Sequence, residues 1–136
     1  MENRIKKALD YHQKGYNCSQ AVICAYCDLF GIDEETAFRM SEGFGAGMGN
    51  TQNTCGAVSA MFMLAGLKTS SGGVEKGVTK AKTYKQVSML SKEFETMNTT
   101  TICKELKGLD GTSMKRSCKG CIEDASKLIE KYLLNN

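Results

Sequence analysis

The sequence predicts an all-α fold: a single compact, helical bundle-like domain of about six to seven helices that spans residues 1–136. Apolar residues recur at the three- and four-residue spacing of amphipathic helices along almost the whole chain. No segment shows the apolar–polar alternation of a half-buried strand. Capping residues and glycines also fall where the spacing indicates that helices begin and end. The length of 136 residues fits one domain.

The first three predicted helices are defined by their caps. Residues 3–14 carry one apolar face, which includes His12, the single histidine of the chain. Asn17 caps a second helix that continues to about residue 30. Asp33 caps a third helix, whose first turn carries two glutamates, where the positive end of the helix dipole favours negative charge.

The rest of the chain is predicted to contain a glycine loop and four further helices. Glycines alternate within residues 42–54, which indicates a loop. The following helix, over about 54–67, is apolar on nearly all sides, so we expect it to be central. A long helix over about 74–97, a short one near 101–107 and a last one near 118–134 complete the chain.

Composition and charge narrow the classes of partner. The chain has 18 Lys and Arg against 15 Asp and Glu, and this net charge of +3 is too small to predict a nucleic-acid or anionic-membrane partner. A basic cluster at Lys115, Arg116 and Lys119 contains no aromatic residue, so we expect a solvated surface there. The longest apolar run, residues 55–67, is too short to cross a bilayer. The N-terminal residues lack an apolar signal segment, so we expect a cytoplasmic protein.

Seven cysteines in a chain without proline are the most unusual feature of the composition. In the cytosol, where thiols are kept reduced, such cysteines are more often metal ligands or redox groups than structural disulfides. Four of them follow or adjoin capping residues at predicted helix starts: Cys18, Cys55, Cys103 and Cys118. The positive end of a helix dipole favours the thiolate, which is the form that binds metals and attacks disulfides. We therefore expect these four thiols to form a common site.

The other three cysteines differ in their expected positions. At 100° per residue, Cys18 shares the core face of its helix with Leu29, whereas Cys24 and Cys27 lie on the opposite side. We expect Cys24 and Cys27 to act as small buried hydrophobic residues. Cys121 lies one turn into the last helix, on its apolar face, where it can contact the cysteine that begins that helix. Burial without a functional role is also open for the cysteines at the helix starts.

Four sequence blocks resemble those of the C_GCAxxG_C_C family of redox-active proteins. They are GYNCSQAV (15–22), GFGAGMGNTQNTCGAV (43–58), TICKELKG (101–108) and CKGCIEDA (118–125), and together they extend over essentially the whole chain. The four cysteines for which the family is named match, in order, the four at the predicted helix starts. One motif position departs, because Ala60 stands where the family has glycine. We expect this methyl group to affect packing near the site and not the fold.

The resemblance also implies a cofactor. A related domain occurs in split-Soret cytochromes, which resemble carriers of an iron–sulfur centre beside haem. This resemblance favours an iron–sulfur cluster here, with Cys18, Cys55, Cys103 and Cys118 as its ligands. Haem is not implied, since neither CAYC nor CKGC is followed by histidine.

Three functions remain open at this point. The first is electron transfer, with an unidentified partner protein, through an iron–sulfur cluster held by the four thiolates. The second is metal-free thiol–disulfide chemistry with Cys55 and Cys118 as the redox-active thiols, supported by the dithiol spacing of CKGC. The third is a site for zinc or another metal in a non-enzymatic protein. The residues decide neither whether the chain is an enzyme nor whether a cluster is shared across a homodimer.

The alternating glycines of the loop are the remaining candidate for cofactor binding. Gly45, Gly47 and Gly49 precede the helix that begins near Cys55, and backbone N–H groups of such a loop can bind an anion or donate to cluster sulfurs. The alternative is a tight turn that lets two helices approach closely. For His12 we expect a partly buried, hydrogen-bonded side chain and not a ligand.

Overall fold

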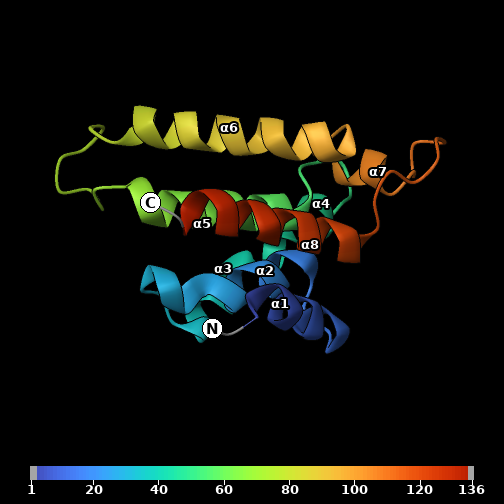
Figure 1. Ribbon diagram of the computed structural model, residues 1–136, viewed down its shortest axis with the longest axis horizontal. Coiled ribbons are helices and arrows are strands. Elements are labelled where there is room, and N and C mark those ends of the chain that lie inside the picture. The colour runs from blue at the N-terminus through green and yellow to red at the C-terminus, as the bar shows by residue number, and fades with distance from the viewer. Residues whose placement is uncertain (1–2, 135–136) are drawn as a thin grey trace.

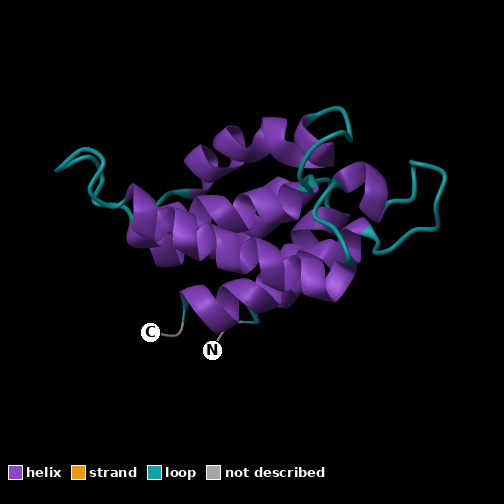
Figure 2. Ribbon diagram, turned by 90° about the horizontal axis from the view of Figure 1, so that it is seen from above, coloured by secondary structure: helices purple, strands orange, loops and turns teal. Residues whose placement is uncertain are grey.

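The computed structural model describes residues 3–134, and its elements confirm the all-α prediction. The helices run between two ends of the molecule, where the longer connections gather (Figure 1 and Figure 2), and no strand forms within the described range. The α-helices are α1 (Arg4–Gln13), α2 (Cys18–Tyr26), α3 (Glu34–Ser41), α4 (Gly45–Met48), α5 (Gly56–Thr69), α6 (Lys80–Asn98), α7 (Cys103–Leu106) and α8 (Cys118–Leu128). Short 3-10 helices occupy Cys27–Phe30 and Glu42–Phe44, and a π-helical turn, Ile129–Leu133, extends α8. None of these helices is long and apolar enough to cross a bilayer.

Side-chain caps fix the starts of the helices that the sequence predicts. The Asn17 side chain accepts from the backbone N–H of Gln20 at 2.9 Å, and the Gln20 side chain accepts from the N–H of Asn17 at 3.0 Å. These two bonds complete a capping box before α2. Asp33 and Ser117 cap α3 and α8 by accepting from backbone N–H groups. Each cap stabilises its helix by about 1 kcal/mol.

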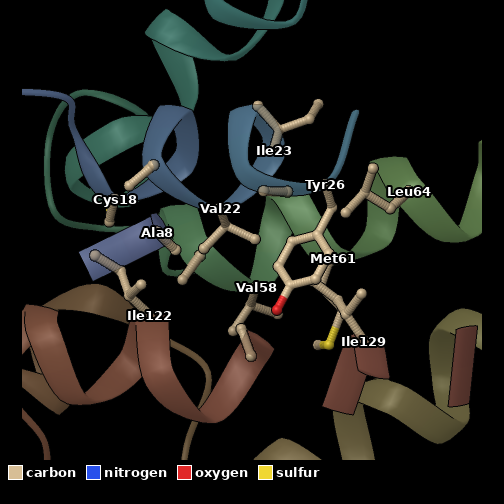
Figure 3. Close-up of a cluster of buried hydrophobic side chains, with 14 of the residues drawn as sticks. Ala8, Cys18, Val22, Ile23, Tyr26, Val58, Met61, Leu64, Ile122 and Ile129 are labelled. Atoms are coloured by element: carbon tan, nitrogen blue, oxygen red, sulfur yellow. The ribbon is translucent and has the colours of Figure 1, made fainter. Parts of the chain in front are cut away.

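The core lies where α2 faces α5 and α8. Figure 3 shows Val22 of α2 among Val58 of α5 and Ile122 of α8. Every residue of α2 is buried, so α2 shares the central position that the sequence predicts for the helix after the glycine loop. Leu90 and Phe94 of α6 are also fully buried, and α6 contacts α5 and α8. Because each fully buried side chain of this size stabilises the fold by about 1.5–3 kcal/mol, this packing fixes the relative positions of the helix ends.

Three features differ from the sequence prediction. The long helix α6 begins at Lys80 and not near residue 74, because three glycines of the preceding connection adopt positive φ. Leu29 is 49% exposed and not on the core face, since α2 ends at Tyr26 and the chain continues as a 3-10 turn with a different periodicity. The last helix changes to π-helical geometry at Ile129.

Candidate thiol site

Five of the seven cysteines line one cavity, at the end of the molecule where α4, α7 and the start of α8 lie together (Figure 1). The residues around this cavity are Cys18, Ala46, Cys55, Cys103, Leu106, Lys107, Arg116, Cys118 and Cys121. The four cysteines that the sequence places at helix starts all belong to this set, and Cys121 joins them. The fold thus brings together thiols that are far apart in the sequence.

Each of the four predicted thiols reaches the cavity from the start of a helix. Cys18, Cys103 and Cys118 are the first residues of α2, α7 and α8. Cys55 is the N-cap residue of α5. The four starts meet because the core packing of α2, α5 and α8 brings these helix ends together.

Backbone pairing before α5 and α7 fixes Cys55 beside Cys103. An isolated antiparallel bridge joins the residues just before them, Thr54 and Ile102. On one side of this bridge, the N–H of Cys103 donates to the carbonyl oxygen of Asn53 at 2.9 Å. The pairing satisfies backbone groups that would otherwise be buried without partners, and it determines where both thiols enter the cavity.

The glycine loop approaches the thiols with its backbone in the left-handed region. Residues 46–49 all have positive φ, including the non-glycine residues Ala46 and Met48. Such a conformation costs roughly 1–3 kcal/mol at a non-glycine residue and persists only where the surroundings impose it. Here it brings the N–H of Ala46 towards the Cys18 thiol, and this N–H acts to lower the pKa of that thiol. The loop therefore supplies an N–H···S contact of the kind that tunes cluster sulfurs.

The three glycines singled out from the sequence lie in different relations to the thiols. A Cβ at Gly47 would lie 2.5 Å from the Cβ of Cys103, so this close approach needs glycine. A Cβ at Gly45 would overlap the Asn17 side chain, which caps α2. A Cβ at Gly49 would meet nothing within 4 Å. Gly47 thus packs against the site and Gly45 against its supporting cap, whereas Gly49 only turns the chain.

Three thiols are neighbours at the centre of the site. The pKa of Cys55 responds to both Cys121 and Cys18. Gly56 permits this arrangement, because a Cβ there would lie 2.6 Å from Sγ of Cys18. Hydrogen bonding to Cys121, together with burial, raises the pKa of the Cys55 thiol to about 12. Hydrogen bonding to Cys55, followed by burial, raises the pKa of Cys18 far above its usual range.

The expectation that helix dipoles favour thiolates is therefore wrong for the buried members of the site. Backbone N–H groups do act in that direction at Cys18 and Cys55, but the neighbouring thiols and burial outweigh them. Burial also raises the pKa of Cys103. At neutral pH the thiols of Cys18, Cys55 and Cys103 are therefore protonated when no metal is bound.

Two cations form part of the cavity wall. Burial opposes the charged form of Lys107, but hydrogen bonding to Cys118 and the charges of the neighbouring thiols together outweigh burial and raise the pKa of Lys107. Arg116 donates through Nε to Asp124 at 3.0 Å and through Nη2 to Glu123 at 3.2 Å. The prediction of a solvated basic surface is wrong for Arg116, whose side chain is half-buried and lines the cavity.

The remaining candidate residues lie outside the cavity. Cys24 and Cys27 are buried, and the Cys24 thiol donates to the carbonyl oxygen of Glu34 at 3.8 Å. Their distance from the site agrees with the prediction that they face the opposite side of α2 from Cys18. His12 is half-buried, as expected, but within residues 3–134 its side chain has no hydrogen-bond partner, and Ala60 is buried within α5; neither lines the cavity.

Sequence reasoning missed Lys107 and Arg116 and only allowed for Cys121. Lys107 follows Cys103 by four residues, which places both on one side of a helical turn, and that spacing was a usable signal. Arg116 precedes the cap of α8, so its direction depends on how the connection from α7 folds. No local pattern could have indicated it.

The cavity offers thiols, which are the donors that both zinc and iron–sulfur clusters accept. Within residues 3–134, no group of three or more His, Cys, Asp or Glu side chains is arranged to hold one metal ion. A tetrahedral zinc site with Zn–S bonds of about 2.3 Å needs sulfurs only about 3.8 Å apart, whereas a cluster binds its thiolates at separate irons. The cavity measures about 10 Å³, close to the minimum for one water molecule. A cluster therefore requires the thiols to move apart.

The protein is an all-α domain in which five cysteine thiols and two cationic side chains line one cavity. The chain belongs to the C_GCAxxG_C_C family, which is described as "Putative redox-active protein" and whose family model matches residues 16–132. This match confirms the resemblance seen in the sequence blocks and places the chain in a redox-active family. No curated protein and no solved structure matches the chain.

Proposed function

We propose that this protein transfers electrons through an iron–sulfur cluster bound by Cys18, Cys55, Cys103 and Cys118. The strongest support is the meeting of these four thiols, from four separate helix starts, around one cavity. Four cysteine thiolates are the usual ligand set of [2Fe–2S] and [4Fe–4S] clusters. When bound, the cluster supplies a centre that accepts and releases an electron.

The protonation state of the thiols disfavours thiol–disulfide exchange at neutral pH. The thiolate is the species that attacks a disulfide, and the raised pKa values of Cys18 and Cys55 leave little thiolate at neutral pH. A metal ion displaces such protons, because a coordinating thiol is deprotonated outright. These buried thiols are therefore poor free nucleophiles and suitable ligands.

The backbone around the thiols would support an anionic centre. The N–H groups of Ala46 and Gly56 act to lower the pKa of Cys18, and the N–H of Ala57 acts to lower that of Cys55. Hydrogen bonds to ligand sulfurs offset the negative charge of thiolates and tune the reduction potential of a cluster. These amides come from the glycine loop and the first turn of α5, so the same segments position the thiols and offset their charge.

The experiment is anaerobic reconstitution of the metal-free protein with ferrous iron and sulfide. We expect visible sulfur-to-iron charge-transfer absorption, and an electron paramagnetic resonance signal in one of the two oxidation states. Titration with zinc under the same conditions distinguishes the zinc alternative. A protein that stays colourless with iron and sulfide but binds one equivalent of zinc tightly would contradict the proposal.

Metal-free dithiol chemistry is a second candidate, and the chain of three neighbouring thiols supports it. A disulfide such as oxidised glutathione would be the oxidant. Attack by Cys121 or Cys55 would form a mixed disulfide and release one glutathione thiol, and attack by the neighbouring thiol would then release the second. The structure favours Cys121 or Cys18, and not Cys118, as the partner of Cys55, since these two thiols are its neighbours. Peptide mapping after equilibration with glutathione would identify the pair.

A further inference from the structure

We propose that Arg116 is a fixed countercharge of the thiol site, held against the cavity by contacts with α6, α7 and α8. The inference rests on the proposed function in one respect, because it concerns how the redox potential of that same site is regulated. The geometry of the Arg116 side chain supports this inference.

The backbone and the side chain of Arg116 are both anchored. Its N–H donates to the carbonyl oxygen of Leu106, at the end of α7, at 3.1 Å. Its guanidinium donates to both carboxylate oxygens of Asp124 in α8, with Nε–Oδ2 and Nη2–Oδ1 distances of 3.0 and 3.2 Å. Asp124 is only 5% exposed, and the side-chain amide of the buried Asn98, the last residue of α6, donates to it at 3.1 Å. Three helices therefore immobilise this one cation.

Gly120 provides the space in which Arg116 lies. A Cβ at Gly120 would overlap the guanidinium and the adjoining methylene of Arg116. Gly120 lies within the α8 helix and has no positive φ, so its backbone conformation does not require glycine. Alanine at position 120 would favour the α8 helix more than glycine does. The glycine of CKGC is thus explained by the packing of Arg116 and not by the chemistry of the flanking thiols.

The position of the guanidinium gives it an electrostatic role. Arg116 lines the cavity, whereas the carboxylates that hold it, Asp124 and Glu123, do not. The guanidinium interacts electrostatically with Cys121, and Lys107, the other cation of the cavity wall, interacts with Cys118. Reduction adds negative charge to the cavity, and a half-buried cation stabilises that charge more than a solvated one does. Arg116 then raises the reduction potential of the site.

The first test compares two ways of removing this charge with a matched control. Arg116→Gln deletes the cation, and Gly120→Ala displaces it while retaining it in the chain. Lys115→Gln removes the same charge from the neighbouring exposed residue, which does not line the cavity. We expect the midpoint potential of the reconstituted site to fall by about 59 mV, a tenfold change for one electron, in both test variants and to stay unchanged in the control. Gly120→Ala keeps the test valid if Arg116→Gln does not fold.

A second readout does not depend on a cluster. Cadmium binding to the metal-free protein, followed by thiolate charge-transfer absorption, reports how well the cavity tolerates several thiolates together. We expect about tenfold weaker binding in Arg116→Gln and Gly120→Ala than in Lys115→Gln. If the chain binds cadmium in a way that depends on Arg116 and yet assembles no cluster, that result would refute the cluster proposal but support Arg116 as a countercharge. Potentials and cadmium affinities that match those of Lys115→Gln would overturn the countercharge proposal.

Discussion

Cys55 is the thiol on which the candidate site depends most, because two other thiols, those of Cys18 and Cys121, are its neighbours. The start of its helix, α5, is also paired with the start of α7 through the bridge between Thr54 and Ile102. We expect Cys55→Ser to abolish the visible absorption of the reconstituted protein, since serine replaces a soft thiolate ligand. Cys24→Ser is the matched control, because Cys24 is equally buried but lies away from the cavity. Absorption spectra of the two variants, with circular dichroism as the test of folding, check this. Equal losses in both would refute the assignment of Cys24 to the opposite side of α2.

The protonated thiols also predict how stability depends on pH in the metal-free protein. A cysteine of the unfolded chain ionises near pH 8.5, whereas Cys55 in the folded protein has a pKa of about 12. The folded state therefore binds more protons than the unfolded state above about pH 8.5, and the free energy of unfolding falls as pH rises towards 12. Each such thiol contributes a slope of about 1.4 kcal/mol per pH unit. Urea unfolding between pH 7 and 10 measures this slope, which Cys55→Ser should reduce; an unchanged slope would contradict the burial argument.

At the scale of residues, the sequence predicted the positions of the thiols better than their chemistry. Caps such as Asn17 and Ser117 are local signals, so the four cysteines at helix starts could be identified without a structure. The protonation state depends instead on burial and on which thiols become neighbours. Arg116 belongs to the site for the same reason, since tertiary packing directs it into the cavity, whereas helical spacing already indicated Cys121.

Among the structural elements, the glycine loop makes the most specific prediction. Gly47 and Gly49 both have positive φ, so alanine at either position costs about 1–2 kcal/mol of backbone strain. Only Gly47→Ala also brings a Cβ against Cys103, and overpacking of this kind costs a further 1–3 kcal/mol or so. We expect Gly47→Ala to lower the free energy of unfolding by more than Gly49→Ala and to impair cluster assembly. Denaturant unfolding of both variants measures the difference, and equal losses would show that the loop does not support Cys103.

Helix boundaries were predictable where a cap or a glycine defines them locally. The starts of α2, α3 and α8 follow their caps. The last helix differs from the prediction only in the π-helical turn at its end. The start of α6 was predicted several residues too early. The apolar spacing continues into the preceding connection, but the positive φ of its glycines prevents a helix there. Periodicity alone does not report backbone conformation.

For the whole molecule, the fold class followed from periodicity, while the convergence of the thiols did not. The apolar faces of α2, α5 and α8 could be identified in the sequence, and their packing forms the core. The meeting of their starts at one end depends on the directions in which the helices run, and on the backbone bridge between Thr54 and Ile102. The positions of the four cysteines at predicted helix starts grouped these thiols, the resemblance of the cysteine blocks matched the same set, and the geometry explains how they meet.

The most direct test of the central claim is the content of iron and acid-labile sulfide per chain in protein purified without exposure to air. Cluster assembly at the thiol site predicts near-stoichiometric amounts of both, lost together in Cys55→Ser. If the protein contains neither iron nor sulfide, even after reconstitution, the cluster proposal is contradicted. The redox chemistry of the site would then belong to the neighbouring thiols of Cys18, Cys55 and Cys121.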